Sequence, residues 1–304
     1  MPGAFPGPVA HLRLIRAGDG ALSDFVKAVL SRCLRLPPGA DGCIIARMTS
    51  AFILQPSAFL FDLDGVFYND TQPIPGGAEV IAQLRAEGVP FRFVTNTTSK
   101  GRVSLAAKLR GFGIVAEPRE IVCPAVAASA FLREKKASGV FFTTVDTRGE
   151  FDGAREDRTQ PDYVVLGDLG DDWTYEKLNQ VLRYLLNGAR LIALGMSRYW
   201  RADDGQRLDV GPVAAAFMYA TGQPPIVLGK PARDFFLLTA HDLNIDPAQC
   251  AMVGDDIVTD IGGAHAAGLQ TILVRTGKFR PQDLDGTVQP DVIIDSIADL
   301  LSET

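Results

Sequence analysis

The sequence predicts an α/β fold, in which a parallel sheet carries helices on both faces. Short apolar runs typical of buried strands alternate with helical periodicity from Phe52 to the C-terminus. Glycines and polar residues follow several of these runs directly, as expected where parallel strands leave a sheet. A second α/β unit begins near Val140, so we expect two structural units.

The composition of the chain excludes several classes of protein. Its 304 residues suffice for two domains, and 47% hydrophobic residues are ordinary for a globular protein. A formal charge of -6 without a broad Lys/Arg stripe argues against nucleic acid as a partner. No run of about 18 apolar residues predicts a membrane span. Four cysteines without metal-binding spacing, Cys33, Cys43, Cys123 and Cys250, predict free buried thiols in a reducing compartment, the cytoplasm.

Residues 1–47 differ from the rest of the chain. They carry six basic and three acidic residues, and Pro and Gly interrupt them often. Such an Arg-rich leader can be an organelle transit peptide, a disordered arm or translated sequence upstream of a start at Met48. The last two interpretations are favoured, so we expect a poorly ordered extension without a catalytic role.

The stretch Ala58–Val66 carries the strongest chemical signal. Its apolar run ends in Asp62 and Asp64, and Gly65 follows at once. The chain leaves the strand here, so both carboxylates can converge only if the loop bends, which Gly65 permits. Taken alone, the stretch is either a metal-binding pair or an Asp-rich turn that ends a strand.

Three further predicted strands also end in polar side chains. They are followed by Thr95 and Asn96, by Lys230, and by Asp255, Asp256 and Asp260. Because the carboxyl ends of parallel strands meet at one edge of a sheet, all four groups can face one crevice. Clustered carboxylates suit Mg²⁺, and a hydroxyl with an ammonium suits a phosphate.

Together these motifs resemble those of the haloacid dehalogenase-like phosphatase superfamily. The resemblance rests on Asp62-Leu63-Asp64-Gly65, Thr95, Lys230-Pro231 and Gly254–Asp260, and it extends from about residue 52 to the C-terminus. The chain is closest to the subclass with a large α/β cap (class IIA). Leu208–Pro212 and Val274–Arg280 are most similar to the phospholysine phosphohistidine inorganic pyrophosphate phosphatase group.

The resemblance implies a Rossmann-like doubly wound parallel-sheet core with an inserted α/β cap domain. The core would comprise residues 48–135 and 226–304, including the strand before Lys230 and a C-terminal helix, and the cap residues 136–225. Relatives of this type are often dimers, so a homodimer is possible. The polar stretch 197–209 is interpreted as a loop that binds a ring or a second phosphate, contacts a partner subunit or is solvated.

The resemblance also assigns roles to the residues at the strand ends. Asp62 would be the nucleophile, and Asp64 the general acid and base. Asp62, the backbone carbonyl of Asp64 and Asp255 would bind Mg²⁺. Thr95 and Lys230, with the amide of Asn96, would hold the phosphoryl group of the substrate. Asp260 and Asp256 would orient metal-bound water or Lys230.

The carboxylate at position 64 favours a phosphatase or a phosphomutase, because dehalogenases of this superfamily lack an acid there. Phosphomutases usually resemble a different cap type, so the phosphatase is favoured. The sequence therefore predicts a Mg²⁺-dependent phosphatase that hydrolyses small phosphorylated metabolites through an aspartyl-phosphate. The alternative is a phosphate- and metal-binding scaffold or regulatory protein without turnover. Candidate substrates include pyrophosphate, phospho-amino acids, pyridoxal phosphate and sugar phosphates.

Overall fold

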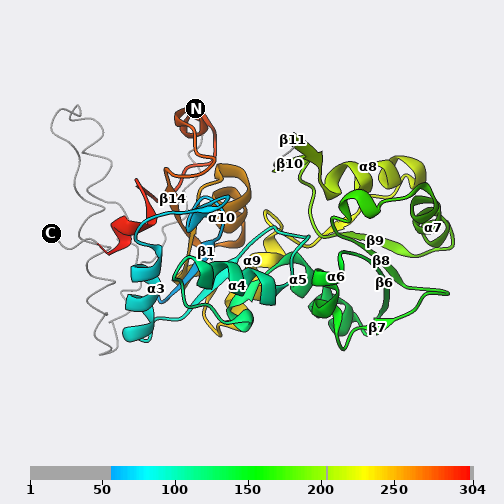
Figure 1. Cartoon of the computed structure of the whole chain (residues 1–304), viewed down its shortest axis with the longest axis horizontal. Helices are drawn as coiled ribbons and strands as arrows, with labels where there is room; N and C mark the ends of the chain where they lie inside the picture. The colour runs from blue at the N-terminus through cyan, green and yellow to red at the C-terminus, as the bar shows by residue number, and fades with distance from the viewer. Residues whose placement is uncertain (1–55, 203–204, 302–304) are drawn as a thin grey trace, which may run out of the picture.

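The computed structural model describes residues 56–202 and 205–301 of the chain. These residues form two lobes that lie side by side along the longest axis (Figure 1). One lobe combines the two ends of the described chain, and the middle of the chain forms the other. The predictions made for residues 1–47 lie outside the described residues.

The first lobe, the core, contains a six-stranded sheet in the order β15-β14-β13-β1-β4-β5. Every neighbouring pair of strands is parallel. Its strands are β1 (Ala58–Asp62), β4 (Phe91–Val94), β5 (Ile121–Val122), β13 (Cys250–Gly254), β14 (Gln270–Val274) and β15 (Val292–Ile294). The chain winds outward from β1 in both directions, which is the predicted doubly wound, Rossmann-like arrangement.

The central strand β1 is buried along its whole length. Phe59 and Phe61 pack into the apolar cluster on one face, and Ala58 and Leu60 into the cluster on the other. The first cluster includes residues of α3 (Gly77–Ala86) and α4 (Arg102–Gly111); the second includes residues of α5 (Pro124–Lys135), α9 (Arg233–Asp242) and α10 (Gly263–Ala267). Because helices cover both faces of the sheet, the β1 residues that face either side are apolar, up to Asp62 at the end of the strand.

The second lobe, the cap, is built on a five-stranded parallel sheet in the order β12-β9-β8-β6-β7. Its elements are β6 (Ser138–Phe142), α6 (Val145–Arg148), β7 (Arg155–Glu156), β8 (Tyr163–Leu166), α7 (Tyr175–Leu186), β9 (Arg190–Ala193), α8 (Val210–Thr221) and β12 (Ile226–Val227). None of the helices in the described part of the chain has the length and apolar character needed to cross a membrane.

The structure corrects three details of the sequence analysis. The strand before Lys230 is β12, which pairs with β9 in the cap sheet and not with a core strand. The expected polar loop at 197–209 contains an antiparallel hairpin of β10 (Tyr199–Ala202) and β11 (Gly205–Leu208). Within the described residues, the expected C-terminal helix is a short 3₁₀ turn, Ile297–Leu300.

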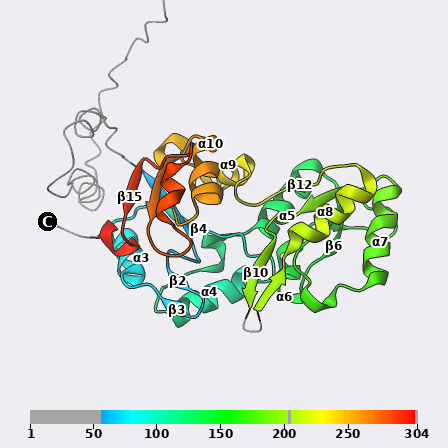
Figure 2. The same ribbon diagram turned by 90° about the horizontal axis from the view of Figure 1, so that it is seen from above.

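The two hairpins of the molecule's described part lie beside the sheets rather than within them. A small one, β2 (Tyr68–Asn69) with β3 (Gln72–Pro73), follows β1. The other, β10 with β11, lies at the side of the cap that faces the core in the view from above (Figure 2).

Candidate active site

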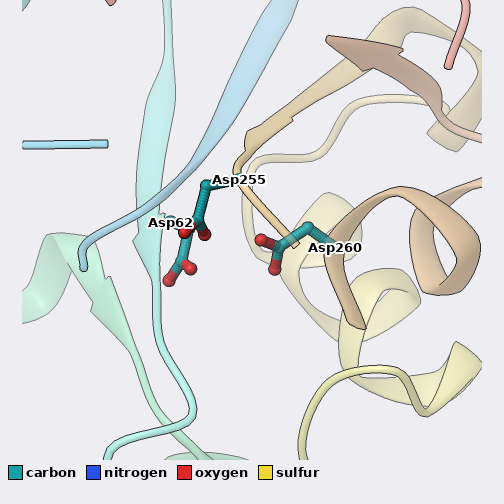
Figure 3. Close-up of side chains that lie close together, drawn as sticks. All are labelled: Asp62, Asp255 and Asp260. Atoms are coloured by element: carbon teal, nitrogen blue, oxygen red, sulfur yellow. The ribbon is translucent and has the colours of Figure 1, made fainter. Parts of the chain in front are cut away.

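Three buried carboxylates meet at the carboxyl ends of two neighbouring core strands. Asp62 is the last residue of β1, and Asp255 directly follows β13, the parallel neighbour of β1. Asp260 reaches the same point from a π-helical turn, Ile257–Gly262 (Figure 3). One oxygen from each carboxylate lies within 4.8 Å of those of the other two. This geometry could hold a metal ion.

Lys230 places a positive charge inside this cluster. Its Nζ lies 2.7 Å from Oδ1 of Asp62 and 2.7 Å from Oδ1 of Asp260, and its side chain is 2% exposed. One ammonium balances only one of the three carboxylates when all are ionised. Since buried charge is costly without a partner, the cluster favours the binding of a further cation.

Burial is the main cause of the shifted pKa values in the cluster. Burial, and then Asp260, raises the pKa of Asp255 to about 6. Burial, and then Asp62, raises the pKa of Asp260 to about 7. Burial also raises the pKa of Asp62, against the opposing effect of Lys230. For Lys230, burial lowers the pKa, but the carboxylates of Asp260 and Asp62 outweigh it and the net shift is upward.

The donor atoms of the cluster fit Mg²⁺. Oδ1 of Asp255 is buried and has no hydrogen-bond partner among the described residues. Leaving a buried carboxylate oxygen without a donor is costly, and a hard divalent cation that prefers oxygen ligands would satisfy it. Of the predicted ligands, Asp62 and Asp255 supply side chains here. Asp260 was predicted to orient metal-bound water or Lys230, and its carboxylate belongs to the same cluster as Asp62 and Asp255.

Asp64 is exposed, and the chain turns sharply after β1. The N–H of Gly65 donates to the carbonyl of Tyr68 at 2.7 Å, and the N–H of Phe67 to the carbonyl of Leu63 at 3.0 Å. Gly65 has a φ of +86°, and a Cβ atom here would lie 2.1 Å from Oδ2 of Asp255. Glycine is therefore required both for the turn and for the space.

The segment after β4 carries Thr95 and Asn96. Thr95 is buried, and its hydroxyl lies 2.9 Å from that of Thr97 and accepts the Thr97 N–H at 3.1 Å. Asn96 donates from Nδ2 to the carbonyl of Lys230 at 2.8 Å and accepts the Lys230 N–H at Oδ1, at 2.7 Å. The side-chain amide of Asn96 thus positions Lys230, so a direct contact with phosphate would fall to its backbone N–H.

Asp256 organises the turn that presents Asp260. Its Oδ1 accepts the N–H groups of Val258 and Thr259, each at 3.0 Å, which caps the π-helical turn. Its own N–H donates to Oδ2 of Asp260 at 3.2 Å. Asp256 therefore acts on the cluster through the backbone position of Asp260.

Comparison with known proteins identifies the family. The profile of the family described as haloacid dehalogenase-like hydrolase matches residues 59–151, and a HAD-hydrolase-like profile matches residues 227–300. The human phospholysine phosphohistidine inorganic pyrophosphate phosphatase is 35% identical over 250 residues, which cover 80% of this chain and 91% of that protein. The chain belongs to the haloacid dehalogenase-like hydrolase family.

Solved structures of haloacid dehalogenase-like hydrolases share the fold. The p-nitrophenyl phosphatase from Archaeoglobus fulgidus has a TM-score of 0.75 and 29% identity, with 81% of this chain and 98% of that chain covered. A glycerol phosphate phosphatase from Mycobacterium tuberculosis, solved with magnesium, has a TM-score of 0.74 and 28% identity, with 81% and 76% covered. The predicted family and subclass, the fold and the enzyme class, a phosphoric monoester hydrolase, are confirmed.

The loop that follows β14 contributes contacts to the site that were not predicted from the sequence. The N–H of Lys278 donates to Oδ2 of Asp255 at 2.6 Å, and the hydroxyl of Thr276 donates to the carbonyl of Gly65. Gly277, with a φ of +66°, approaches both. In the sequence, Val274–Arg280 indicated only a similarity to one phosphatase group. The sequence signal for this contact is Thr276-Gly277-Lys278, one residue after β14, a strand that neighbours β13.

Proposed function

We propose that this chain is a Mg²⁺-dependent phosphatase that hydrolyses small phosphorylated metabolites through an aspartyl-phosphate on Asp62. The observation that carries the proposal is the buried Asp62 carboxylate, 2.7 Å from the Lys230 ammonium and next to Asp255 and Asp260. An ionised, oriented carboxylate beside a cation site is what nucleophilic attack on a phosphoryl group requires.

The contacts of Asp62 orient it as the nucleophile. Its Oδ1 accepts the N–H of Leu63 at 2.7 Å and lies 2.7 Å from Nζ of Lys230. With Oδ1 held by two donors, Oδ2 is the oxygen that attacks phosphorus. The new bond from Oδ2 to phosphorus forms as the bond from phosphorus to the leaving atom breaks, and that atom takes the electron pair.

Asp64 is suited to proton transfer because its carboxyl group is exposed two residues beyond Asp62. It donates a proton to the leaving atom in the first step. In the second step it accepts a proton from the water whose oxygen attacks phosphorus. The bond between phosphorus and Asp62 then breaks, and inorganic phosphate leaves.

The remaining groups stabilise charge on the phosphoryl oxygens. The Thr95 hydroxyl and the Lys230 ammonium would hold these oxygens during transfer. Asp62, Asp255 and the main-chain carbonyl of Asp64 would hold Mg²⁺, which supplies positive charge to the phosphoryl group when bound. Asp260 shares Lys230 with Asp62 and so keeps the ammonium in place.

The proposed substrates are small molecules with P–O or P–N bonds. The human relative is named for phospholysine, phosphohistidine and inorganic pyrophosphate, and two structural neighbours are named for p-nitrophenyl and glycerol phosphates. A substrate panel measured as kcat/KM would rank these classes.

A cytoplasmic location is also proposed. Cys123 and Cys250, the two cysteines in the described part of the chain, are buried and free. Burial raises the pKa of each thiol to about 11, so both stay protonated. Such thiols are typical of a reducing compartment. The homodimer stays a prediction.

Acid quenching during turnover tests the central step. The enzyme is mixed with 4-nitrophenyl phosphate and Mg²⁺, quenched within milliseconds and digested for mass spectrometry. We expect a phosphoryl adduct on the peptide that contains Asp62, and none in Asp62→Asn. Turnover with the adduct on another residue, or phosphate binding without any phosphate release across the panel, would contradict the proposal.

A further inference from the structure

The ammonium of Lys278 stands at the exposed side of the carboxylate cluster. Its main-chain N–H donates to Asp255 at 2.6 Å, which fixes the backbone at this point. Its Nζ lies 3.7 Å from Oδ2 of Asp256, and the side chain is 66% exposed. The backbone is therefore anchored in the site, while the charged end of the side chain reaches solvent.

Lys230 and Lys278 face the same carboxylates in different ways. Nζ of Lys230 makes two contacts of 2.7 Å and is buried, so its charge is committed to Asp62 and Asp260. Lys278 makes one longer contact in partly solvated surroundings, and such an ion pair contributes little to stability. Because the lysine side chain is flexible, its ammonium can exchange Asp256 for an anion of the substrate at little cost.

The direction of the reaction places the leaving group on this exposed side. In phosphoryl transfer the attacking and leaving atoms lie roughly in line through phosphorus. Asp62 attacks from the buried end of β1, at 6% exposure, so the leaving group extends toward solvent. The Lys278 ammonium is close enough to Asp62 and Asp255 to interact with both charges, so a second anionic group on the leaving atom could pair with it.

We propose that Lys278 determines specificity by binding a second anionic group of the substrate, and thereby favours inorganic pyrophosphate over phosphate monoesters with uncharged leaving groups. This inference rests on the proposed phosphatase function. Because Lys278 acts through its side chain, Lys278→Met removes the ammonium and keeps the N–H that holds Asp255. Lys278→Arg keeps a positive charge.

Hydrolysis of two substrates tests the role with Mg²⁺ present. For Lys278→Met we expect KM for pyrophosphate to rise about tenfold or more, the loss typical of one charge-assisted hydrogen bond, with kcat within twofold. Kinetic constants for 4-nitrophenyl phosphate should change less than threefold. In Lys278→Arg, the KM for pyrophosphate should lie close to the wild-type value. Arg275→Met is the matched control, because Arg275 pairs with Asp295 on the surface and should affect neither substrate.

Calorimetry separates this inference from the proposed function, because it needs no turnover. Methylenediphosphonate and methylphosphonate are titrated into each variant with Mg²⁺. Lys278→Met should lose about tenfold in affinity for methylenediphosphonate alone. Equal losses for both ligands, or a loss for neither, would overturn the role of Lys278 whether or not the enzyme is active. If the selective loss of affinity is observed but neither substrate is hydrolysed, the proposed function is overturned instead.

Discussion

The core and the cap share one architecture but differ in what their strand ends carry. Both are parallel sheets with helices packed against them. In the core, Asp62 and Asp255 at neighbouring strand ends form a buried carboxylate cluster with Asp260, and Lys230 pairs with Asp62 and Asp260. In the cap, β8 is followed by Asp168, whose Oδ1 accepts the N–H of Gly170 at 2.8 Å within its own turn. Both topologies supply strand ends where a site could form, but only in the core do charged side chains from neighbouring strands converge.

The junction between the lobes shows a third arrangement, in which polar groups are paired. Arg102 of α4 donates through its main-chain N–H and its Nε to Glu150 of the cap, at 2.8 and 2.6 Å. The hydroxyl of Thr147 donates to the carbonyl of Thr98 at 2.9 Å. The segment that follows Thr95 is therefore held by the cap. These contacts hold the two lobes together with their polar groups paired, whereas the unbalanced charge lies in the carboxylate cluster of the core.

The largest expected effect separates two buried aspartates at strand ends. Asp62→Asn removes the proposed nucleophile, so kcat for 4-nitrophenyl phosphate should fall by at least about 10³-fold. Asp168→Asn retains an acceptor for the Gly170 N–H, so kcat should change by less than about threefold. Both are measured at saturating Mg²⁺, with circular dichroism to confirm the fold. Similar losses in the two variants would contradict the division of roles between the lobes.

Two glycines with positive φ allow the next comparison. Gly65 lies against Asp255, whereas a Cβ atom at Gly188 of the cap, with a φ of +104°, would meet nothing within 4 Å. Alanine at either position should cost about 1–3 kcal/mol in the free energy of unfolding, because both backbones are strained for L-residues. Gly65→Ala should also displace the Asp255 carboxylate and lower kcat/KM by about 10²-fold, whereas Gly188→Ala should keep full activity. Urea unfolding and hydrolysis assays check both effects, and a fully active Gly65→Ala would show that the carboxylate tolerates displacement.

Much of the core site could be predicted from sequence, because its residues follow apolar runs at the ends of parallel strands. Asp62 and Asp255 were brought together by this rule alone. The contact of Lys278 with Asp255 was not predicted, because it depends on how the loop after β14 folds. The sheet that contains β12 was misassigned because two apolar residues, Ile226 and Val227, fit either sheet. The hairpin at 199–208 has few apolar residues, so its sequence looked like a solvated loop.

The pH dependence of Mg²⁺ binding follows from the raised pKa of Asp255, about 6. Below pH 6 the ion must displace a proton, so its apparent affinity should fall by up to about tenfold per pH unit; above pH 6 this effect disappears. Without Mg²⁺, the contribution of Asp255 to the free energy of unfolding changes with pH in the opposite direction. The folded state keeps a proton that the unfolded state loses above the ordinary value of 3.8, so stability falls as pH rises through about 6.

Melting temperatures measured with and without Mg²⁺ between pH 5 and 8 check both signs. The increase in Tm caused by Mg²⁺ should grow with pH and level off once Asp255 and then Asp260, with a pKa of about 7, have lost their protons. Asp255→Asn should show little Mg²⁺-dependent increase at any pH. A Mg²⁺ effect that is constant from pH 5 to 8 would contradict proton displacement in the cluster.

The smallest expected effect on catalysis lies at the junction between the lobes. The Glu150 side chain is 7% exposed and accepts two hydrogen bonds from Arg102, so Glu150→Gln should cost about 1–3 kcal/mol in the free energy of unfolding. Asp295→Asn, which breaks the exposed pair with Arg275, should cost less than about 0.5 kcal/mol. Because neither residue touches the carboxylate cluster, kcat for 4-nitrophenyl phosphate should stay within threefold in both variants. If Glu150→Gln lowered kcat strongly while urea unfolding was unchanged, the junction would belong to the catalytic machinery, and the contrast between paired and reactive charge would fail.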